Sequence, residues 1–221
     1  MLRQLPVWVL AGSVMLALNA GFINSVALLS FANNAVSHVT GTATIAAEAL
    51  VSGHADVLFH TVTIILSFIV GAIASGVIVG NEALQLGRRY GLALVIEALL
   101  LFLAWYAFRE DSVAAEWLAS AACGLQNAMV ATYSGSVIRT THLTGIVSDI
   151  GSAIGNFLAG RGLLKGQLAL QSSIMLAFIG GAAIGAATFG VLGYDAVLIN
   201  GLWVAAVALA YSIFLLRRKR L

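Results

Sequence analysis

The feature that most constrains this chain is a series of long apolar runs, each close to the roughly 20 residues that an α-helix needs to cross a bilayer. Of the 221 residues, 61% are hydrophobic and 9% are charged, whereas a soluble domain carries roughly 25% charged residues. So few polar side chains cannot cover a water-soluble core. We therefore predict an all-α polytopic membrane bundle of about six transmembrane helices, over Pro6–Phe31, Val57–Val79, Gly91–Phe108, Ala115–Ile138, Leu170–Leu192 and Tyr194–Leu216.

The positions of Lys and Arg between these runs predict the orientation, because cytoplasmic loops are enriched in these cations. With both termini in the cytoplasm, Arg109 is the only cation outside. The cytoplasmic side then holds Arg3, Arg88, Arg89, Arg139, Arg161, Lys165, Arg217, Arg218, Lys219 and Arg220. This imbalance supports an even number of spans and a multi-pass protein of the inner membrane. The partner that it implies is the lipid bilayer, and no nucleic-acid-binding pattern is present.

Short motifs recur in the same order in the two halves of the chain. Gly21–Ser25 matches Gly124–Ala128, Ser37–Gly41 matches Thr141–Gly145, Phe68–Ala72 matches Phe178–Ala182, and Val95–Leu99 matches Leu198–Leu202. Each copy holds an odd number of spans, so the second copy enters the membrane in the opposite orientation. We predict a single membrane domain, 1–221, made of two inverted three-helix repeats at about 6–108 and 115–216, with a basic tail at 217–221. Many secondary transporters have this architecture.

A segment after the first span of each copy is neither a loop nor a full span. Ala32–Ala55 and Arg139–Ala169 each contain polar residues, then a Thr-Gly pair, then an apolar stretch too short to cross. We predict short half-helices after spans 1 and 4. Two arrangements remain open: helices that re-enter the protein, and amphipathic helices that lie flat at the interface.

The Thr-Gly pairs mark where these half-helices start. Thr40 and Thr144 have side chains suited to N-capping, and Gly41 and Gly145 permit close backbone approach. If the helix N-termini point inward, their free N–H groups favour a polar or anionic ligand. We include all four residues among the substrate-path candidates.

Polar side chains inside the spans are costly in lipid and are therefore candidate functional residues. Asn24 and Asn127 occupy matching places after a glycine, and Gln126 adds another amide. Either they line a solute path or they hold helices together through hydrogen bonds. Glu97 is the deepest carboxyl group, and Asn200 stands in its place in the second copy. Glu97 either couples proton movement or is a neutral, hydrogen-bonded side chain.

His38 and His142 precede the two Thr-Gly pairs, and Asp149 follows the second pair. The histidines could relay protons or bond to the turn, and the acid could favour a helix N-terminus or pair with Arg139. We expect no metal site, because the repeat separates the histidines and zinc needs converging ligands. We expect no cofactor either.

Small residues recur one helical turn apart in the second and fifth runs, at Gly71 and Ser75 and at Gly181 and Gly185. This spacing lets helices approach closely, and we expect that packing inside the bundle. A homo-oligomer face is the alternative. The single cysteine, Cys123, excludes an intramolecular disulfide, and no nucleophile constellation is present, so we do not expect an enzyme.

The motifs of the second half, Gly124–Ala128, Arg139–Gly145 and Asp149, resemble those of the YoaK family of bacterial membrane proteins. The resemblance extends over nearly the whole chain. It implies a six-span protein of the bacterial inner membrane with no established substrate. The first half departs from the family pattern, in which an aspartate stands where this chain has Asn24. That departure weakens any proton-coupled mechanism taken over from the family.

These patterns favour a small secondary transporter or permease for a small polar solute. The inverted repeat and the paired broken segments are the reasons. A non-transporting membrane scaffold or accessory subunit is the alternative hypothesis.

Overall fold

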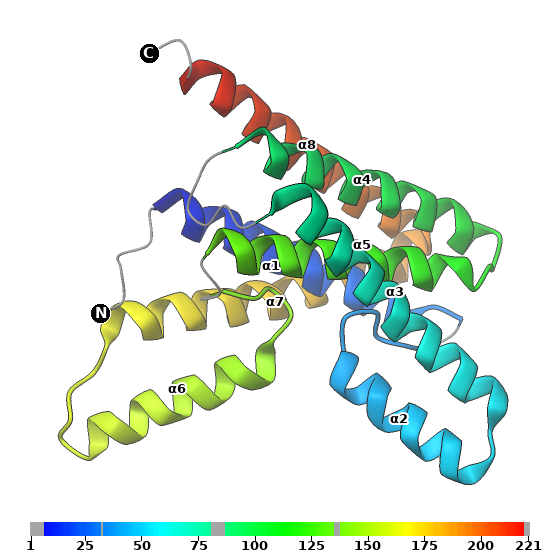
Figure 1. Cartoon of the computed structure of the whole chain (residues 1–221), viewed down its shortest axis with the longest axis horizontal. Coiled ribbons are helices and arrows are strands. Elements are labelled where there is room, and N and C mark those ends of the chain that lie inside the picture. The colour runs from blue at the N-terminus through cyan, green and yellow to red at the C-terminus, as the bar shows by residue number, and fades with distance from the viewer. Residues whose placement is uncertain (1–6, 32, 81–86, 135–137, 219–221) are drawn as a thin grey trace.

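The computed structural model describes residues 7–31, 33–80, 87–134 and 138–218, and every regular element in these ranges is an α-helix. Figure 1 shows the long helices packed across one another, with two short helices at the edge. The all-α class is therefore confirmed. The helices are α1 (Val7–Leu29), α2 (Val39–Ser52), α3 (Ala55–Val79), α4 (Arg88–Arg109), α5 (Ala114–Tyr133), α6 (Leu143–Leu158), α7 (Lys165–Leu192) and α8 (Asp195–Arg218).

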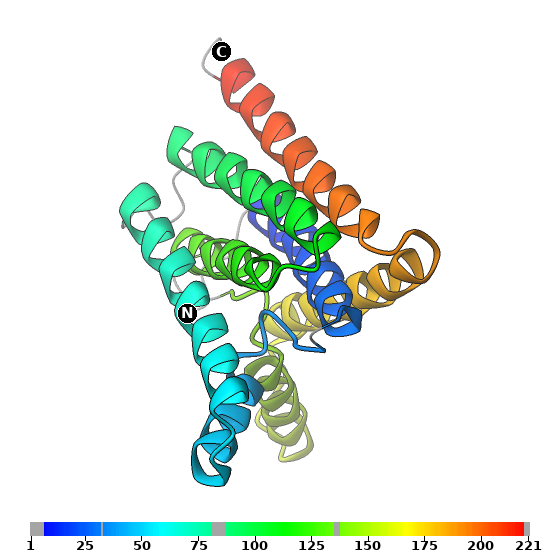
Figure 2. The ribbon, with the colours of Figure 1, turned by 90° about the vertical axis from the view of Figure 1, so that its right-hand side faces the viewer.

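Five of these helices, α1, α3, α4, α7 and α8, are long and apolar enough to cross a membrane. The sixth predicted span, Ala115–Ile138, corresponds to α5, whose 20 residues do not meet the same standard. The reason is the polar content of α5, which includes Glu116, Ser120 and Gln126. All three side chains are buried inside the protein. In Figure 2, α5 lies beside α1 in the middle of the bundle. Protein contacts rather than lipid therefore surround most of α5.

The helices follow one another in the same order in both halves: long, short, long, long. The main contacts cross between the halves, because α1 packs along α7 and α5 packs along α3. The last helices of the halves, α4 and α8, also pack together, and α4 covers α5. The two halves are thus interlocked into one body, with α1 and α5 enclosed by the other long helices.

Glycines at matching motif positions permit the two main crossings. A side chain on Gly21 would collide with the backbone carbonyl of Phe178 in α7, and one on Gly124 would collide with that of Phe68 in α3. Gly181 and Gly71 face the same crossings from the other side, against Leu18 and Ala121 respectively. The expected packing of small residues inside the bundle is therefore confirmed.

The two segments between spans form the short helices α2 and α6, as predicted. They have 14 and 16 residues, which at 1.5 Å per residue gives roughly 21 and 24 Å, less than the ~30 Å hydrocarbon core. Figure 1 shows both starting near the middle of the molecule and running outward to opposite sides. α2 packs mainly on α3, and α6 packs on α7.

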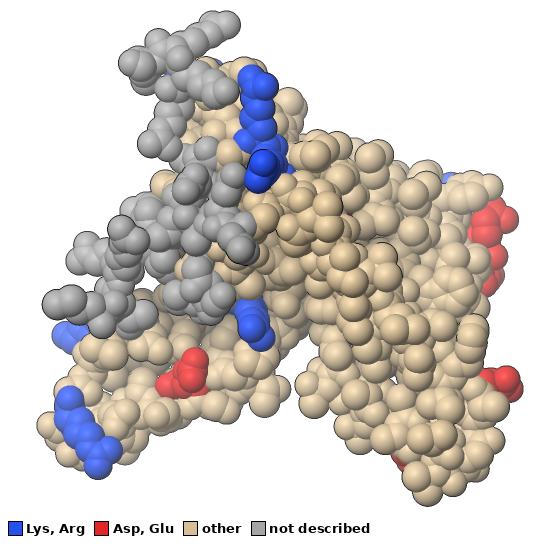
Figure 3. Space-filling view, viewed as in Figure 1, with Lys and Arg blue, Asp and Glu red and all other residues tan. Residues whose placement is uncertain are grey.

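Charged side chains gather at the two ends of this arrangement. In Figure 3, most Lys and Arg in view lie on the left side of the molecule and most Asp and Glu on the right side, with a broad apolar surface between them. The same view shows a notch between the part of the molecule that contains α2 and the part that contains α6. The separation of charge runs in the direction in which the long helices extend.

Candidate functional site

A cluster of buried polar side chains joins four helices in the interior. Asn19 of α1 donates its amide hydrogens to Glu97 of α4, at 3.1 Å between Nδ2 and Oε1, and to Gln126 of α5, at 2.9 Å between Nδ2 and Oε1. These three residues are 1–2% exposed. The only acid predicted deep in a span is therefore held beside amides.

Gln126 and Asn200 extend this cluster. The Gln126 amide donates from Nε2 to the carbonyl of Leu16 at 2.9 Å and to Oγ1 of Thr140 at 3.1 Å. Asn200 of α8 donates from Nδ2 to the carbonyl of Asn19 at 3.4 Å. We call Asn19, Glu97, Gln126, Thr140 and Asn200 the polar cluster. Its members come from both halves of the chain.

Three oxygens of the polar cluster are buried acceptors without a hydrogen-bond partner among the described residues: Oδ1 of Asn19, Oε2 of Glu97 and Oδ1 of Asn200. Buried polar groups are almost always paired, and each unpaired one costs about 1–3 kcal/mol. Since all three are acceptors, the cluster lacks donors rather than acceptors. A proton, a cation or a donor group of a ligand would complete it.

The predicted asparagines Asn24 and Asn127 lie outside the polar cluster. Their side chains form hydrogen bonds with the non-helical segments before α2 and α6. The Oδ1 atom of Asn24 accepts from the backbone N–H and the hydroxyl of Ser37, at 3.0 and 2.8 Å. The Oδ1 atom of Asn127 accepts from the backbone N–H of Thr141 at 3.4 Å. Both amides are half-buried. Each therefore holds the segment that leads into its half-helix.

Histidines, not threonines, occupy the N-cap positions of the half-helices. His38 and His142 precede α2 and α6, and neither makes a side-chain capping hydrogen bond. Each imidazole lies over the glycine three residues on, so that a side chain on Gly41 or Gly145 would collide with the ring. The prediction that threonines cap these helices is wrong, because the helices begin one residue before them.

Thr40 and Thr144 are exposed, within the first turns of α2 and α6. Their carbonyls accept hydroxyl hydrogen bonds from Thr44 and Ser148, at 3.0 and 2.9 Å.

Asp149 is exposed on α6 and accepts a hydrogen bond from Gln171 of α7, at 2.7 Å between Nε2 and Oδ2. It therefore ties α6 to the helix that follows it. Of the predicted acids, only Glu97 reaches the polar cluster.

A second polar pair, of which only the glutamate is fully buried, lies between α3 and α5. Nε2 of His60 and Oε2 of Glu116 are 2.8 Å apart, and the Glu116 side chain is completely buried. Nearby, Ser120 can donate its hydroxyl to the carbonyls of Val36 and Ile64, at 3.0 and 2.9 Å. This pair and this serine join α3, α5 and the segment before α2, and sequence reasoning did not find them.

Sequence reasoning found Glu97 and Gln126 but missed Asn19, the residue that connects them. The missed signal was the polarity of Asn19 inside an apolar run, the same signal that identified Asn24 five residues later. Asn200 was noted only as the counterpart of Glu97. The repeat did not mark Asn19 as a candidate, because the residue that matches Asn19 in the second copy is the apolar Ala122.

The polar cluster supplies one carboxyl group and several amides. Within the described ranges, no three His, Cys, Asp or Glu side chains come together as metal ligands do. These features define a multi-pass helical membrane protein with a polar centre buried among its spans.

The chain belongs to a family described as protein of unknown function (DUF1275), which matches residues 12–215. YoaK-like proteins are members of this family, so the resemblance found in the sequence is confirmed. No curated protein matches the chain, and neither does any solved structure.

Proposed function

We propose that the protein is a small secondary transporter or permease for a small polar solute. The observation that carries this proposal is the polar cluster, which leaves three acceptor oxygens unpaired in the interior of the bundle. Polar groups at this depth are costly and commonly mark solute or ion pathways. A solute with a hydrogen-bond donor would pair with these oxygens.

The two half-helices add a second line of support. Both begin near the middle of the molecule and extend to opposite sides (Figure 1). Broken helices that start near the midplane are the usual binding elements of transporters built from inverted repeats. In this proposal α1–α4 and α5–α8 are the two inverted repeats, and the solute passes between them.

The proposal includes a location. The chain resides in the bacterial inner membrane with both termini in the cytoplasm, because the cationic end of the molecule in Figure 3 faces inward under the positive-inside rule. His38 and His142, with the Thr-Gly pairs beside them, then lie along the route of the solute. The proposal assigns no chemical reaction to the protein.

The test begins with purified protein and a panel of metabolites, measured by the shift in unfolding temperature. Each compound that stabilises the protein is then tested for uptake into proteoliposomes. Glu97→Gln should reduce flux, whereas the matched change Glu110→Gln, at an exposed position after α4, should not. The absence of ligand-dependent flux with every stabilising compound would refute transport.

A membrane scaffold or accessory subunit is the second candidate. It is favoured by the uncovered surfaces of the half-helices, where Val51 is 89% and Leu158 is 79% exposed. Isolation from mild detergent with a stoichiometric partner supports this candidate if substitutions on α2 or α6 release the partner.

A further inference from the structure

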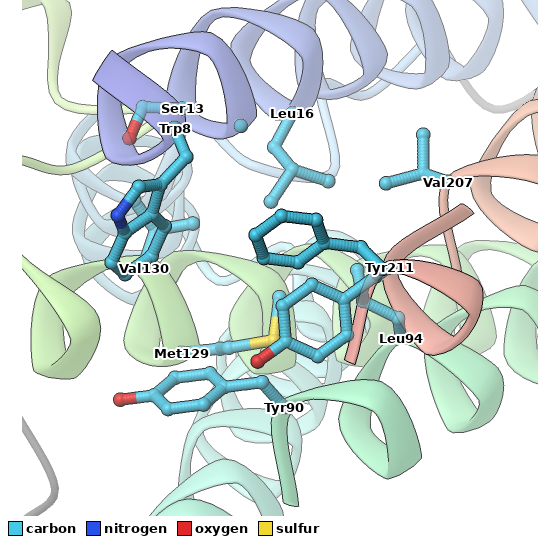
Figure 4. A pocket seen from close by; sticks show the side chains of 11 residues that line it. Trp8, Ser13, Leu16, Tyr90, Leu94, Met129, Val130, Val207 and Tyr211 are labelled. Atoms are coloured by element: carbon cyan, nitrogen blue, oxygen red, sulfur yellow. The ribbon is translucent and has the colours of Figure 1, made fainter. Parts of the chain in front are cut away.

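An apolar cavity lies at one end of the helix bundle, between α1, α4, α5 and α8. Its volume is about 180 Å³, more than the ~150 Å³ of an apolar cavity that accepts benzene. Figure 4 shows the rings of Trp8, Tyr90 and Tyr211 around the hollow, with Leu94 and Met129 beside them. The cavity can therefore hold a segment of an alkyl chain.

The residues that line this cavity come from helix ends on the same side of the molecule. Trp8 and Tyr90 lie in the first turns of α1 and α4, and Phe214 lies in the last two turns of α8. The Tyr211 hydroxyl connects two of these ends, because it accepts from the backbone N–H of Gly87 at 3.2 Å and donates to the Gly87 carbonyl at 3.1 Å. Tryptophan and tyrosine are typical of the boundary between hydrocarbon and water. The cavity therefore lies near that boundary.

The cavity reaches the outer surface of the bundle beside α8. Phe214 lines the cavity and is 45% exposed. Its neighbours on α8, Ile213 and Leu216, are exposed as well, so this surface is apolar and suited to lipid. Among the described residues that line the cavity none is charged, and Ser13 supplies the only aliphatic hydroxyl. A hydrocarbon chain that enters from the membrane thus meets an apolar wall.

Two exposed arginines lie next to the residues of this cavity. Arg88 directly follows Gly87, the residue that Tyr211 contacts. Arg217 follows Phe214 by one turn, so the two are neighbours on the surface of α8. Within the described ranges neither arginine has an acidic partner. In Figure 3, Lys and Arg side chains lie on the side of the molecule where α8 ends and α4 begins in Figure 1. Cations at such a place attract anionic head groups.

We propose that the cavity binds one acyl chain of an anionic phospholipid, whose head group is bound by Arg88 and Arg217. The apolar cavity and the two cations point to one ligand, because a phospholipid joins an apolar chain to a phosphate at the membrane boundary. This site is separate from the polar cluster and goes beyond the proposed transport of a polar solute. Lipid binding can be measured without transport.

Fluorescence quenching by brominated lipids tests this site, because bromine quenches a tryptophan that the brominated chain contacts. The probes are phosphatidylglycerol, which is anionic, and phosphatidylcholine, which has no net charge, with identical brominated chains. They are added to the purified full chain in detergent. The signal of Trp8 is the difference between the wild-type protein and Trp8→Phe. The signal of Trp203, which is 40% exposed on α8 outside the cavity, is obtained in the same way with Trp203→Phe.

Phosphatidylglycerol should quench Trp8 at a mole fraction about tenfold or more below that of phosphatidylcholine, as expected for two cations near an anionic head group. The two lipids should quench Trp203 alike, because a chain on the outer surface of α8 needs no bound head group. Equal quenching of Trp8 by the two lipids in the wild-type protein would overturn the assignment of an anionic lipid.

Two glycine variants locate the chain. Gly12 lines the cavity and has open space beside it, so Gly12→Leu fills the cavity without a backbone collision. Gly76, on α3, also has open space and lies outside the cavity, so Gly76→Leu is the matched control. Gly12→Leu should abolish the quenching of Trp8 at low mole fractions of either lipid, and Gly76→Leu should leave it unchanged. Undiminished quenching in Gly12→Leu would overturn the location.

Charge variants test the head-group contact. Arg88→Gln combined with Arg217→Gln should remove the preference for phosphatidylglycerol while the quenching of Trp8 by phosphatidylcholine stays the same. The matched control is Arg161→Gln combined with Lys165→Gln, which removes the same charge at exposed positions between α6 and α7. The control should keep the preference. An equal loss of preference in both double variants would overturn the assignment of the head group to Arg88 and Arg217.

Discussion

Asn19 lies between the two acceptors Glu97 and Gln126 and donates to both, at 3.1 and 2.9 Å. Replacing Asn19 with leucine leaves two buried side chains without their donor. At about 1–3 kcal/mol for each unpaired group, Asn19→Leu should lower the free energy of unfolding by about 2–6 kcal/mol. Denaturant unfolding in detergent measures this change. Asn156→Leu, on the exposed side of α6, is the control. Equal unfolding midpoints for the two variants would contradict a structural polar cluster.

The crossing of α1 and α7 gives a test with neighbouring glycines. Gly181→Ala places a methyl group against the backbone carbonyl of Leu18, whereas Gly180 has nothing within reach of a new methyl group. Overpacking typically costs about 1–3 kcal/mol, and a backbone collision in a helix crossing belongs at the upper end. Thermal unfolding should therefore show a lower midpoint for Gly181→Ala and an unchanged one for Gly180→Ala. Two indistinguishable midpoints would show that the crossing is looser than described.

The asparagines before the half-helices should differ in importance. Asn24 accepts two hydrogen bonds from Ser37, and Asn127 accepts one long bond from Thr141. Asn24→Ala should therefore loosen the start of α2 more than Asn127→Ala loosens the start of α6. Hydrogen exchange of the two segments measures this directly. The reverse order of protection would rule out these bonds as the main restraint.

Cysteine labelling tests the inverted arrangement. With Cys123 replaced by alanine, single cysteines are placed at the exposed positions Ala55, after α2, and Ala159, after α6. The two positions should react with a membrane-impermeant reagent from opposite faces of the membrane, Ala55→Cys from outside and Ala159→Cys from the cytoplasm. Labelling of both from one face would refute the inverted repeat, and the transport proposal would lose its architectural basis.

Tyr194, between α7 and α8, should make stability depend on high pH. Burial raises the pKa of Tyr194 above its ordinary value of 10.0, and the carboxylate of Asp111 adds to this, while a backbone hydrogen bond with Phe31 acts in the opposite direction. Folding therefore favours the neutral phenol. Its contribution is complete below the ordinary pKa and is lost as the pH rises through the raised value.

Comparison with Tyr194→Phe isolates this effect. The ring still stacks on Phe108, whose centroid is 5.5 Å away, but no proton can be lost. Between about pH 9 and 11, around the tyrosine pKa, the unfolding temperature of the wild-type protein should fall more than that of the variant. Parallel curves would mean that the Tyr194 hydroxyl is freely solvated.

The positions of the helices could be predicted from the sequence with little error. The apolar runs at Val57–Val79 and Leu170–Leu192 lie within α3 and α7, because hydrocarbon thickness sets the length of a spanning helix. The short helices α2 and α6 were also predicted, because the apolar stretch after each Thr-Gly pair is too short to cross. The family was identified from the motifs of the second half.

The candidate site could be predicted only in part. Glu97 and Gln126 were found because a polar group in an apolar run is conspicuous at any depth. The same pattern gave equal weight to Asn24, whose amide instead accepts hydrogen bonds from Ser37 in the non-helical segment before α2. Polarity in a sequence does not reveal the direction in which a side chain points.

The sequence by itself determined the class of the protein, the helix lengths and the glycines at which helices meet, because these follow from local composition and from the repeat. Only the tertiary structure decided that Asn19 connects Glu97 to Gln126 and that α5 is enclosed by protein. The physical reason is that each contact depends on how helices distant in the chain cross and rotate against one another. Such crossings are set by the packing of whole surfaces, which no single segment of the chain specifies.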